Sequence, residues 1–238
     1  MRTTGVSAAL VAAGALALAA GAAVPARALT AQEIAARASA AYAADKGGIT
    51  DYQCRFASVR LNGEGEEEQR YSGYNYFREP DRFGQEITEM YVKGKKKDPN
   101  EGGGESESVG FKLPFDAECI ADYTFAYSRT DVVDGVECYV LTVASDKREE
   151  GYVHGRAWVE SAGFKVLALD VAMYKNPKYV TEMGVKVWFA DFGGHRMLRK
   201  FVAVGKFSAF LVMRGSFTIT ETYDDYRFDV GVPDAKLK

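Results

Sequence analysis

The chain has 238 residues, of which 47% are apolar and 26% charged, and its formal net charge is −3. This length and apolar share predict one globular domain and exclude a disordered or collagen-like chain. The slight negative charge excludes a general attraction to nucleic acid, and two His and three Cys leave little material for a metal centre.

Residues 1–28 have the layout of a secretory signal peptide. A basic residue is followed by the uncharged, apolar stretch Gly5–Val24, and a small-residue cleavage pattern ends at Ala28. We therefore expect cleavage after about Ala28 and a single mature domain over 29–238. The alternative is an uncleaved membrane anchor, because about 20 apolar residues can span a bilayer. The first Cys is Cys54, which argues against a lipid anchor at the cut.

The mature chain begins with a helix signal. Thr30 and Glu33 have the spacing of a capping box, in which each side chain bonds to the other residue's backbone amide. Apolar residues then recur at helical spacing from Ile34 to Tyr42. The sequence predicts a helix from about residue 31 to 46, ended by Gly47-Gly48.

From Asp51 onward, strand formers alternate and turn signals separate them, such as Asn62-Gly63, Asp134-Gly135 and Gly215. The expected strands are Tyr52–Leu61, Glu66–Arg78, Arg82–Val92, Val136–Ala144, Gly155–Glu160, Phe164–Tyr174, Lys178–Asp191, Met197–Val204, Lys206–Met213 and Phe217–Tyr223. About ten strands with little helix predict a mainly β (α+β) fold with one curved or closed antiparallel sheet.

Residues 93–108 contain Lys95-Lys96-Lys97 and a run of glycines. A phosphate-binding loop needs a strand before it and a helix after it, and neither is evident. We expect a polar surface loop, and the alternative is a lysine contact with anionic headgroups.

The expected strands are apolar on both faces, most clearly in the C-terminal half. In Phe164–Tyr174, for example, Leu167, Leu169, Val171 and Met173 alternate with Phe164, Val166 and Ala168. One short helix cannot cover so much apolar surface. The remaining surface is expected to fill a barrel, pack in a sandwich, meet a partner or line a cavity for an apolar ligand.

The three cysteines allow at most one internal disulfide in an exported protein. Cys119 and Cys138 are the expected pair, since 18 residues separate them, and Cys54 would remain a buried thiol. The alternative is that each Cys is a small apolar residue in the core.

No catalytic constellation is found in the sequence. His154 and His195 lie far apart, and neither a zinc-protease helix nor a nucleophile elbow is present. We therefore expect no catalytic residue, no metal site, no cofactor and no enzyme activity.

Four segments resemble the LolA/LolB-type superfamily of periplasmic carriers and its outer membrane lipoprotein-sorting protein group. These segments are Gly73–Phe83, Val133–Leu141, Gly155–Glu160 and Tyr226–Pro233. The resemblance implies a half-open barrel of ten to eleven strands, with an N-terminal helix and a helical lid over a concave side that binds acyl chains. An Arg before the turn Pro latches the lid in that family; here the position is Glu79, and Arg78 points to the opposite face.

From the residues and the resemblance together, we expect a hydrophobic cavity. Its expected lining is Phe77, Phe83, Trp158, Leu167, Leu169, Val171, Met173, Val187, Phe189, Leu211 and Met213.

The functional hypothesis is a monomeric periplasmic carrier of a lipid, or of the acyl chains of a lipoprotein, toward the outer membrane. The alternative is a periplasmic sensor or interaction module that docks an inner- or outer-membrane protein through its apolar sheet. A third hypothesis, an enzyme acting on a lipid headgroup, has no candidate residues. No nucleic acid partner is expected.

Overall fold

A computed structural model describes residues 28–99, 111–209 and 213–237 of this chain, with the side chains of residues 209 and 213 left out. The predicted signal peptide, apart from Ala28, lies outside the described residues, as does Leu211. Within the described part of the chain, no helix is long and apolar enough to cross a membrane.

The helix α1, Ala31–Lys46, forms where the capping box predicts it. Thr30 Oγ1 accepts a hydrogen bond from the Glu33 amide at 3.2 Å, and Glu33 Oε2 accepts one from the Thr30 amide at 2.8 Å. These bonds satisfy two amides at the helix terminus that have no partner inside the helix. The predicted helix is confirmed.

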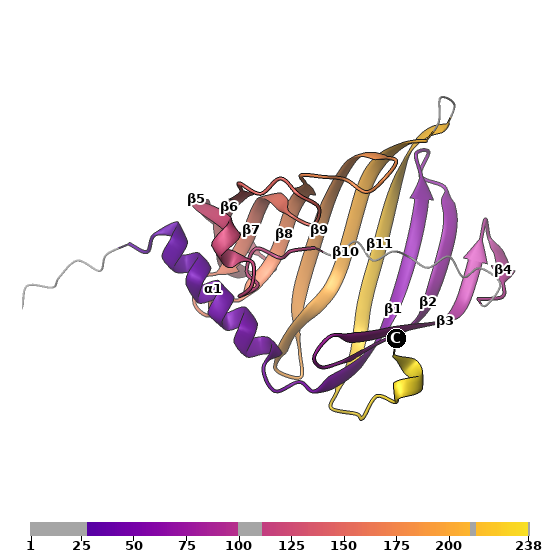
Figure 1. The fold of residues 1–238 in the computed structure, drawn as a ribbon, viewed down its shortest axis with the longest axis horizontal. Helices are drawn as coiled ribbons and strands as arrows, with labels where there is room; N and C mark the ends of the chain where they lie inside the picture. The colour runs from indigo at the N-terminus through magenta and orange to yellow at the C-terminus, as the bar shows by residue number, and fades with distance from the viewer. Residues whose placement is uncertain (1–27, 100–110, 210–212, 238) are drawn as a thin grey trace, which may run out of the picture.

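Eleven strands form one antiparallel sheet (Figure 1). They are β1 Asp51–Asn62, β2 Glu67–Arg78, β3 Arg82–Val92, β4 Lys95–Lys97, β5 Tyr123–Val133, β6 Val136–Ser145, β7 Val153–Glu160, β8 Val166–Met173, β9 Val180–Phe192, β10 His195–Ala209 and β11 Met213–Phe228. Their order is β4-β3-β2-β1-β11-β10-β9-β8-β7-β6-β5, so the first and last long strands pair, and β4 and β5 form the two edges. The predicted mainly β, curved half-barrel is confirmed.

The main core lies between α1 and the strands β5 to β9, and it extends to Ala203 of β10 and Phe217 of β11. Ile34, Ala35 and Ala38 of α1 are buried against inward residues of these strands, such as Leu141 and Val159. Small alanines let the helix approach the sheet closely, which explains why its thin apolar stripe is sufficient here. Figure 1 shows α1 at one end of the sheet, away from β1 to β3.

The segment from residue 111 to 122 completes this cover. Phe111, Leu113 and Phe115 pack on the core, and the hydroxyl of Tyr123 donates to the Lys112 carbonyl at 2.6 Å. It ends in a short 3₁₀ helix, η1, Ile120–Asp122. Within the described residues α1 is the sole α-helix, so the helical cover expected on the concave side is α1 together with this irregular segment.

Two predicted strand boundaries are wrong. Met197–Val204 and Lys206–Met213 belong largely to one strand, β10, and Gly215 lies inside β11 rather than in a turn. In addition, the predicted loop 93–108 contains the short edge strand β4, which pairs with β3.

The C-terminal tail after β11 returns to the face of β2 and β3 opposite Phe77 and Phe83. Val232 and Leu237 form a small second core with Tyr76, and the tail ends in the 3₁₀ helix η2, Asp234–Lys236. The tail therefore packs against the β2–β3 hairpin.

Candidate functional site

A hollow of about 1750 Å³ lies on the concave side of the sheet. Aromatic and aliphatic side chains supply most of its sheet lining: Tyr52, Cys54, Phe77, Phe83, Leu169, Val171, Val185, Val187, Phe189, Leu198, Phe201, Tyr223 and Tyr226. Tyr42 and Lys46 border it from α1, and residues 235–237 border it from the C-terminal tail.

Strand register brings these residues to one face. Val187 of β9 lies opposite Leu169 of β8 and Phe201 of β10. Tyr52 of β1 lies opposite Phe77 of β2. Because directly paired residues in a sheet point to the same side, the pairing alone predicts that these side chains share the concave face.

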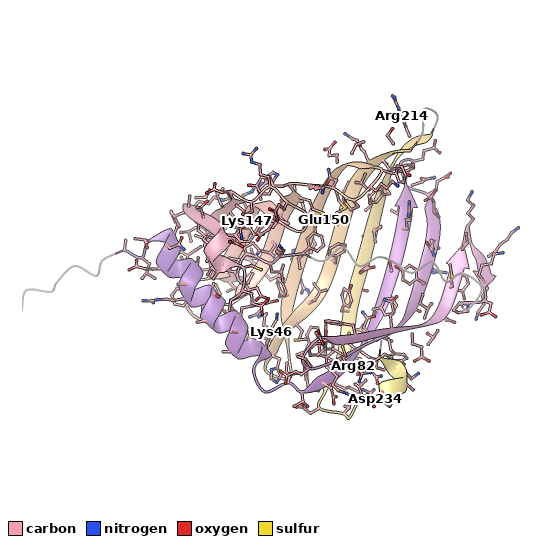
Figure 2. All side chains as sticks on the ribbon, viewed as in Figure 1. Lys46, Arg82, Lys147, Glu150, Arg214 and Asp234 are labelled. Carbon is pink, nitrogen blue, oxygen red and sulfur yellow. The ribbon has the colours of Figure 1, made fainter. Side chains whose placement is uncertain are left out.

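The concave face has a covered half and an open half. The covered half, β5 to β9, packs under α1 and the segment 111–122. The open half consists of β10, β11 and β1 to β3, and no described helix lies in front of it in Figure 1. Lys46, at the end of α1, lies toward the boundary between the two halves in Figure 2. The hollow lies along this boundary and extends over the open half.

The aromatic rings of the open half contact one another. Tyr52 stacks on Phe77 at 5.2 Å between ring centroids and contacts Tyr226 at 5.7 Å. Phe77 in turn contacts Phe83 at 5.0 Å. Such a cluster offers a continuous apolar wall with few side-chain rotamers to freeze when a ligand binds.

The wall also carries basic and acidic side chains, among them Arg196 of β10 and Glu86 of β3, but the polar groups of its aromatic cluster are uncharged. Burial raises the pKa of the Tyr52 and Tyr226 hydroxyls above their ordinary values, and it raises the pKa of the Cys54 thiol to about 11. The Tyr226 hydroxyl donates to the Leu198 carbonyl at 2.8 Å. At neutral pH these groups carry no charge, which suits an apolar occupant.

Six of the predicted lining residues come together in this hollow: Phe77, Phe83, Leu169, Val171, Val187 and Phe189. Met173 lies in the covered core rather than in the hollow. Leu211 is outside the described residues, and of Met213 only its place in β11 is described.

The structure does not place Trp158 and Leu167 in the hollow. A register shift between Trp158 and Val159, opposite β8, changes the alternation at this point, so that Val166 rather than Leu167 joins the core. Trp158 lies on the other face from Ala157 and Val159, and its indole donates to Asp131 Oδ2 at 3.1 Å. The expectation that both residues line the cavity is corrected accordingly.

Four aromatic residues that line the open half are absent from the predicted lining: Tyr52, Phe201, Tyr223 and Tyr226. Alternation within the strands was the available signal for them. Alternation gave no information on Tyr226, because the predicted strand ends at Tyr223 whereas β11 continues to Phe228.

The expected Cys119–Cys138 disulfide is not formed, and all three cysteines are free. Cys138 lies opposite Asp131 near one end of the β5–β6 pair. Cys119 precedes the short helix η1, after which Tyr123 lies opposite Ser145 at the other end. The two ends are about 23 Å apart at about 3.3 Å per residue, far beyond disulfide reach. Cys54 is the buried thiol that was expected.

Among the residues that the structure describes, no group of three or more His, Cys, Asp or Glu side chains is arranged to hold a metal ion.

Comparison with solved structures finds similar folds. A DUF1329 family protein from Desulfovibrio piger superposes with a TM-score of 0.52 at 14% identity, covering 87% of this chain and 97% of that one. A LolA superfamily protein from Nitrosomonas europaea gives 0.42 at 15% identity, covering 89% and 98%. A domain described as an outer membrane lipoprotein-sorting protein from Vibrio parahaemolyticus gives 0.47 at 12% identity, covering 86% and 94%.

No family model matches the sequence, and no curated protein matches it either. The fold is similar to that of the DUF1329 family protein from Desulfovibrio piger. At these identities the similarity concerns the fold alone.

Proposed function

We propose that this chain is a periplasmic carrier that binds a lipid, or the acyl chains of a lipoprotein, in the concave hollow for transport toward the outer membrane. The observation that carries the proposal is the hollow of about 1750 Å³ with its aromatic and aliphatic wall. No cofactor and no catalysis are needed, because binding and release are sufficient.

The size and chemistry of the hollow fit this occupant. A methylene group fills roughly the space of one water molecule, about 30 Å³, so a sixteen-carbon chain needs about 500 Å³. Its burial is worth about 0.8 kcal/mol per methylene, or roughly 12 kcal/mol gross. A single acyl chain therefore fits with room to spare, and apolar contact alone provides enough free energy for binding.

Phe201 allows a direct test. Its side chain lies on the open half of the wall, so Phe201→Glu would place a charge where the acyl chain binds. We expect the purified 29–238 domain to bind a fluorescent fatty-acid probe and the variant to bind it at least about tenfold more weakly.

The matched control is Val204→Glu. Val204 lies on the same strand, on the opposite face, and is 54% exposed, so the same chemical change should leave probe binding unaltered. Circular dichroism establishes that both variants are folded. A folded wild-type domain that does not bind the probe would overturn the proposal.

A second candidate function is an interaction module for a membrane-protein partner. It is favoured by the edge strand β5, on which Tyr127 and Val132 are 51% and 64% exposed. A free edge strand can pair with a strand of another chain. Purification from the native periplasm distinguishes the two: a stoichiometric protein without extractable lipid supports the module, and bound lipid without such a protein supports the carrier.

The proposed location depends on cleavage of residues 1–28. Intact-mass measurement of the protein recovered from the periplasm would detect a mature chain beginning near Leu29, whereas a chain retaining residues 1–28 in the membrane would support the anchor instead.

A further inference from the structure

The carboxylate of Glu221 lies on the concave face of the open half. Glu221 of β11 pairs with Ser58 of β1 on one side and with Phe201 of β10 on the other. Tyr223 follows two residues later on the same face. Phe201 and Tyr223 both line the hollow, so Glu221 lies next to two of its lining residues on the same face of the sheet.

Glu221 is partly buried and has a neutral donor as its partner. The hydroxyl of Tyr223 donates a short hydrogen bond to Glu221 Oε2. Burial, with the nearby Glu221 charge adding to it, raises the pKa of both Tyr223 and Tyr71. Both phenols therefore stay protonated, so they can donate hydrogen bonds but cannot neutralise the carboxylate.

Within the described residues, no Lys, Arg or His nitrogen lies within 4.0 Å of the Glu221 carboxylate. The nearest basic position in the sheet register is Arg60, diagonal to Glu221. Its guanidinium group is instead 3.3 Å from Glu68 Oε2 and lies over the Phe217 ring at 5.5 Å.

An ionised carboxylate that is partly buried without a counter-charge is unfavourable unless a cation is supplied. A carboxylate also has about four acceptor sites, and the hydroxyls of Tyr223 and Tyr71 can occupy two of them. The apolar wall of the hollow lies beside the Glu221 carboxylate. An amphiphile whose acyl chain lies against that wall could therefore place its polar end next to Glu221.

Resting on the proposed carrier function, we propose that Glu221 is a headgroup subsite that selects amphiphiles whose polar end is an ammonium group. The chain would lie against Phe201 and Tyr223 while the ammonium N–H groups donate to Glu221. A carboxylate or phosphate head would be repelled at the same position.

Three probes with the same twelve-carbon chain test this: dodecylammonium, dodecanol and dodecanoate. Each is titrated below its micelle concentration against the 29–238 domain loaded with a neutral fluorescent lipid probe. We expect dodecylammonium to bind about tenfold more tightly than dodecanol, the gain typical of a charge-assisted hydrogen bond, and dodecanoate to bind more weakly than either.

Glu221→Gln keeps the side-chain size and removes the charge, so it should abolish the preference while leaving dodecanol binding unchanged. Glu182→Gln is the matched control, because Glu182 is 69% exposed and paired with Lys206 at 2.8 Å. It should keep the preference, which separates a local effect from the overall negative charge.

If dodecanol binds but dodecylammonium has no advantage, or if Glu221→Gln retains the advantage, the subsite is overturned and the carrier proposal stands. If none of the three probes binds to the folded domain, the carrier proposal itself fails.

Discussion

Gly84 of β3 lies directly against the backbone of the C-terminal tail. A Cβ atom at this position would lie 1.6 Å from the Lys236 carbonyl oxygen, a distance that no side chain can occupy. The absence of a side chain therefore allows the tail to pack on β3, next to the residues that support the hollow.

We expect Gly84→Ala to lower the free energy of unfolding by about 1–3 kcal/mol, because the tail must move away from the strand to make room. Urea denaturation measures this, and limited proteolysis reports whether the tail has become accessible. The matched control is Gly184→Ala in β9, where a Cβ would meet nothing within 4 Å. Equal stability of the two variants would contradict the close packing of the tail.

Other glycines explain where prediction from sequence was wrong. The Phe217 ring lies over Gly205, and the Phe207 ring lies over Gly215, so that a Cβ at either glycine would be within 2.8 Å of a ring carbon. A glycine at this position is typical of a turn, and the sequence therefore predicts one at Gly215. The structure instead needs a glycine there to make room for the Phe207 ring of the neighbouring strand. Local sequence alone does not contain that contact.

At the scale of elements, the C-terminal tail is held to the β2–β3 hairpin by charge. Asp234 accepts hydrogen bonds from Arg78 at 2.7 Å and from Arg82 at 2.5 Å, and Figure 2 shows Arg82 and Asp234 side by side. Lys236 also bonds Glu86 at 2.6 Å. Arg78, which follows the residue Phe77 of the aromatic wall, therefore binds the tail.

These contacts predict an acid-sensitive tail. The guanidinium groups of Arg82 and Arg78 lower the pKa of Asp234 below its ordinary value. Because the pKa of Asp234 is lower in the folded protein than in the unfolded chain, its ionised form stabilises the fold. This contribution is complete above the pKa of the unfolded chain, near 3.9, and it is lost as the pH falls through the pKa of the folded protein.

Asp234→Asn should accordingly lower the melting temperature at pH 7 and reduce its dependence on pH below about 4. Thermal melts over this range measure the effect. Asp146→Asn, at an exposed position on the β6–β7 loop, is the control and should follow the wild-type profile. An unchanged profile for Asp234→Asn would contradict a role for this ion pair in holding the tail.

The elements themselves were largely predictable. Residues 31–46 and the strand Arg82–Val92 form as expected, because capping and alternation are local signals. The faces of β7 and β8 were not predictable, since the register shift beside Trp158 depends on how the two strands pair. That shift moved Trp158 and Leu167 out of the predicted lining.

At the scale of the whole molecule, the three cysteines lie far from one another. Cys119 and Cys138 lie toward opposite ends of the β5–β6 pair, and Cys54 is on β1 in the open half. The fold is therefore held together by packing and hydrogen bonds, without a covalent link between strands.

We expect a reducing agent to leave the unfolding curve of the protein unchanged. Alkylation in denaturant without prior reduction should modify three thiols per chain, as counted by mass spectrometry. A loss of stability on reduction, or a count of one thiol, would show that the expected disulfide forms after all.

The division of the concave face into halves could not be predicted from the sequence. It depends on β1 pairing with β11, which are far apart along the chain, and on α1 lying beside β5 and β10. The apolar excess of the strands indicated that some surface would remain uncovered. The position of that surface follows from long-range pairing.

The strands of the open half are joined to the packed half by an unbroken hydrogen-bonded ladder from β9 through β10 and β11 to β1. If the chain carries an apolar cargo as proposed, the empty molecule would retain its architecture, because the walls of the hollow belong to the same hydrogen-bonded sheet as the packed core. In the proposed carrier, release would require no refolding of the protein, and the rate of delivery would depend on how quickly the hydrocarbon chain leaves the hollow.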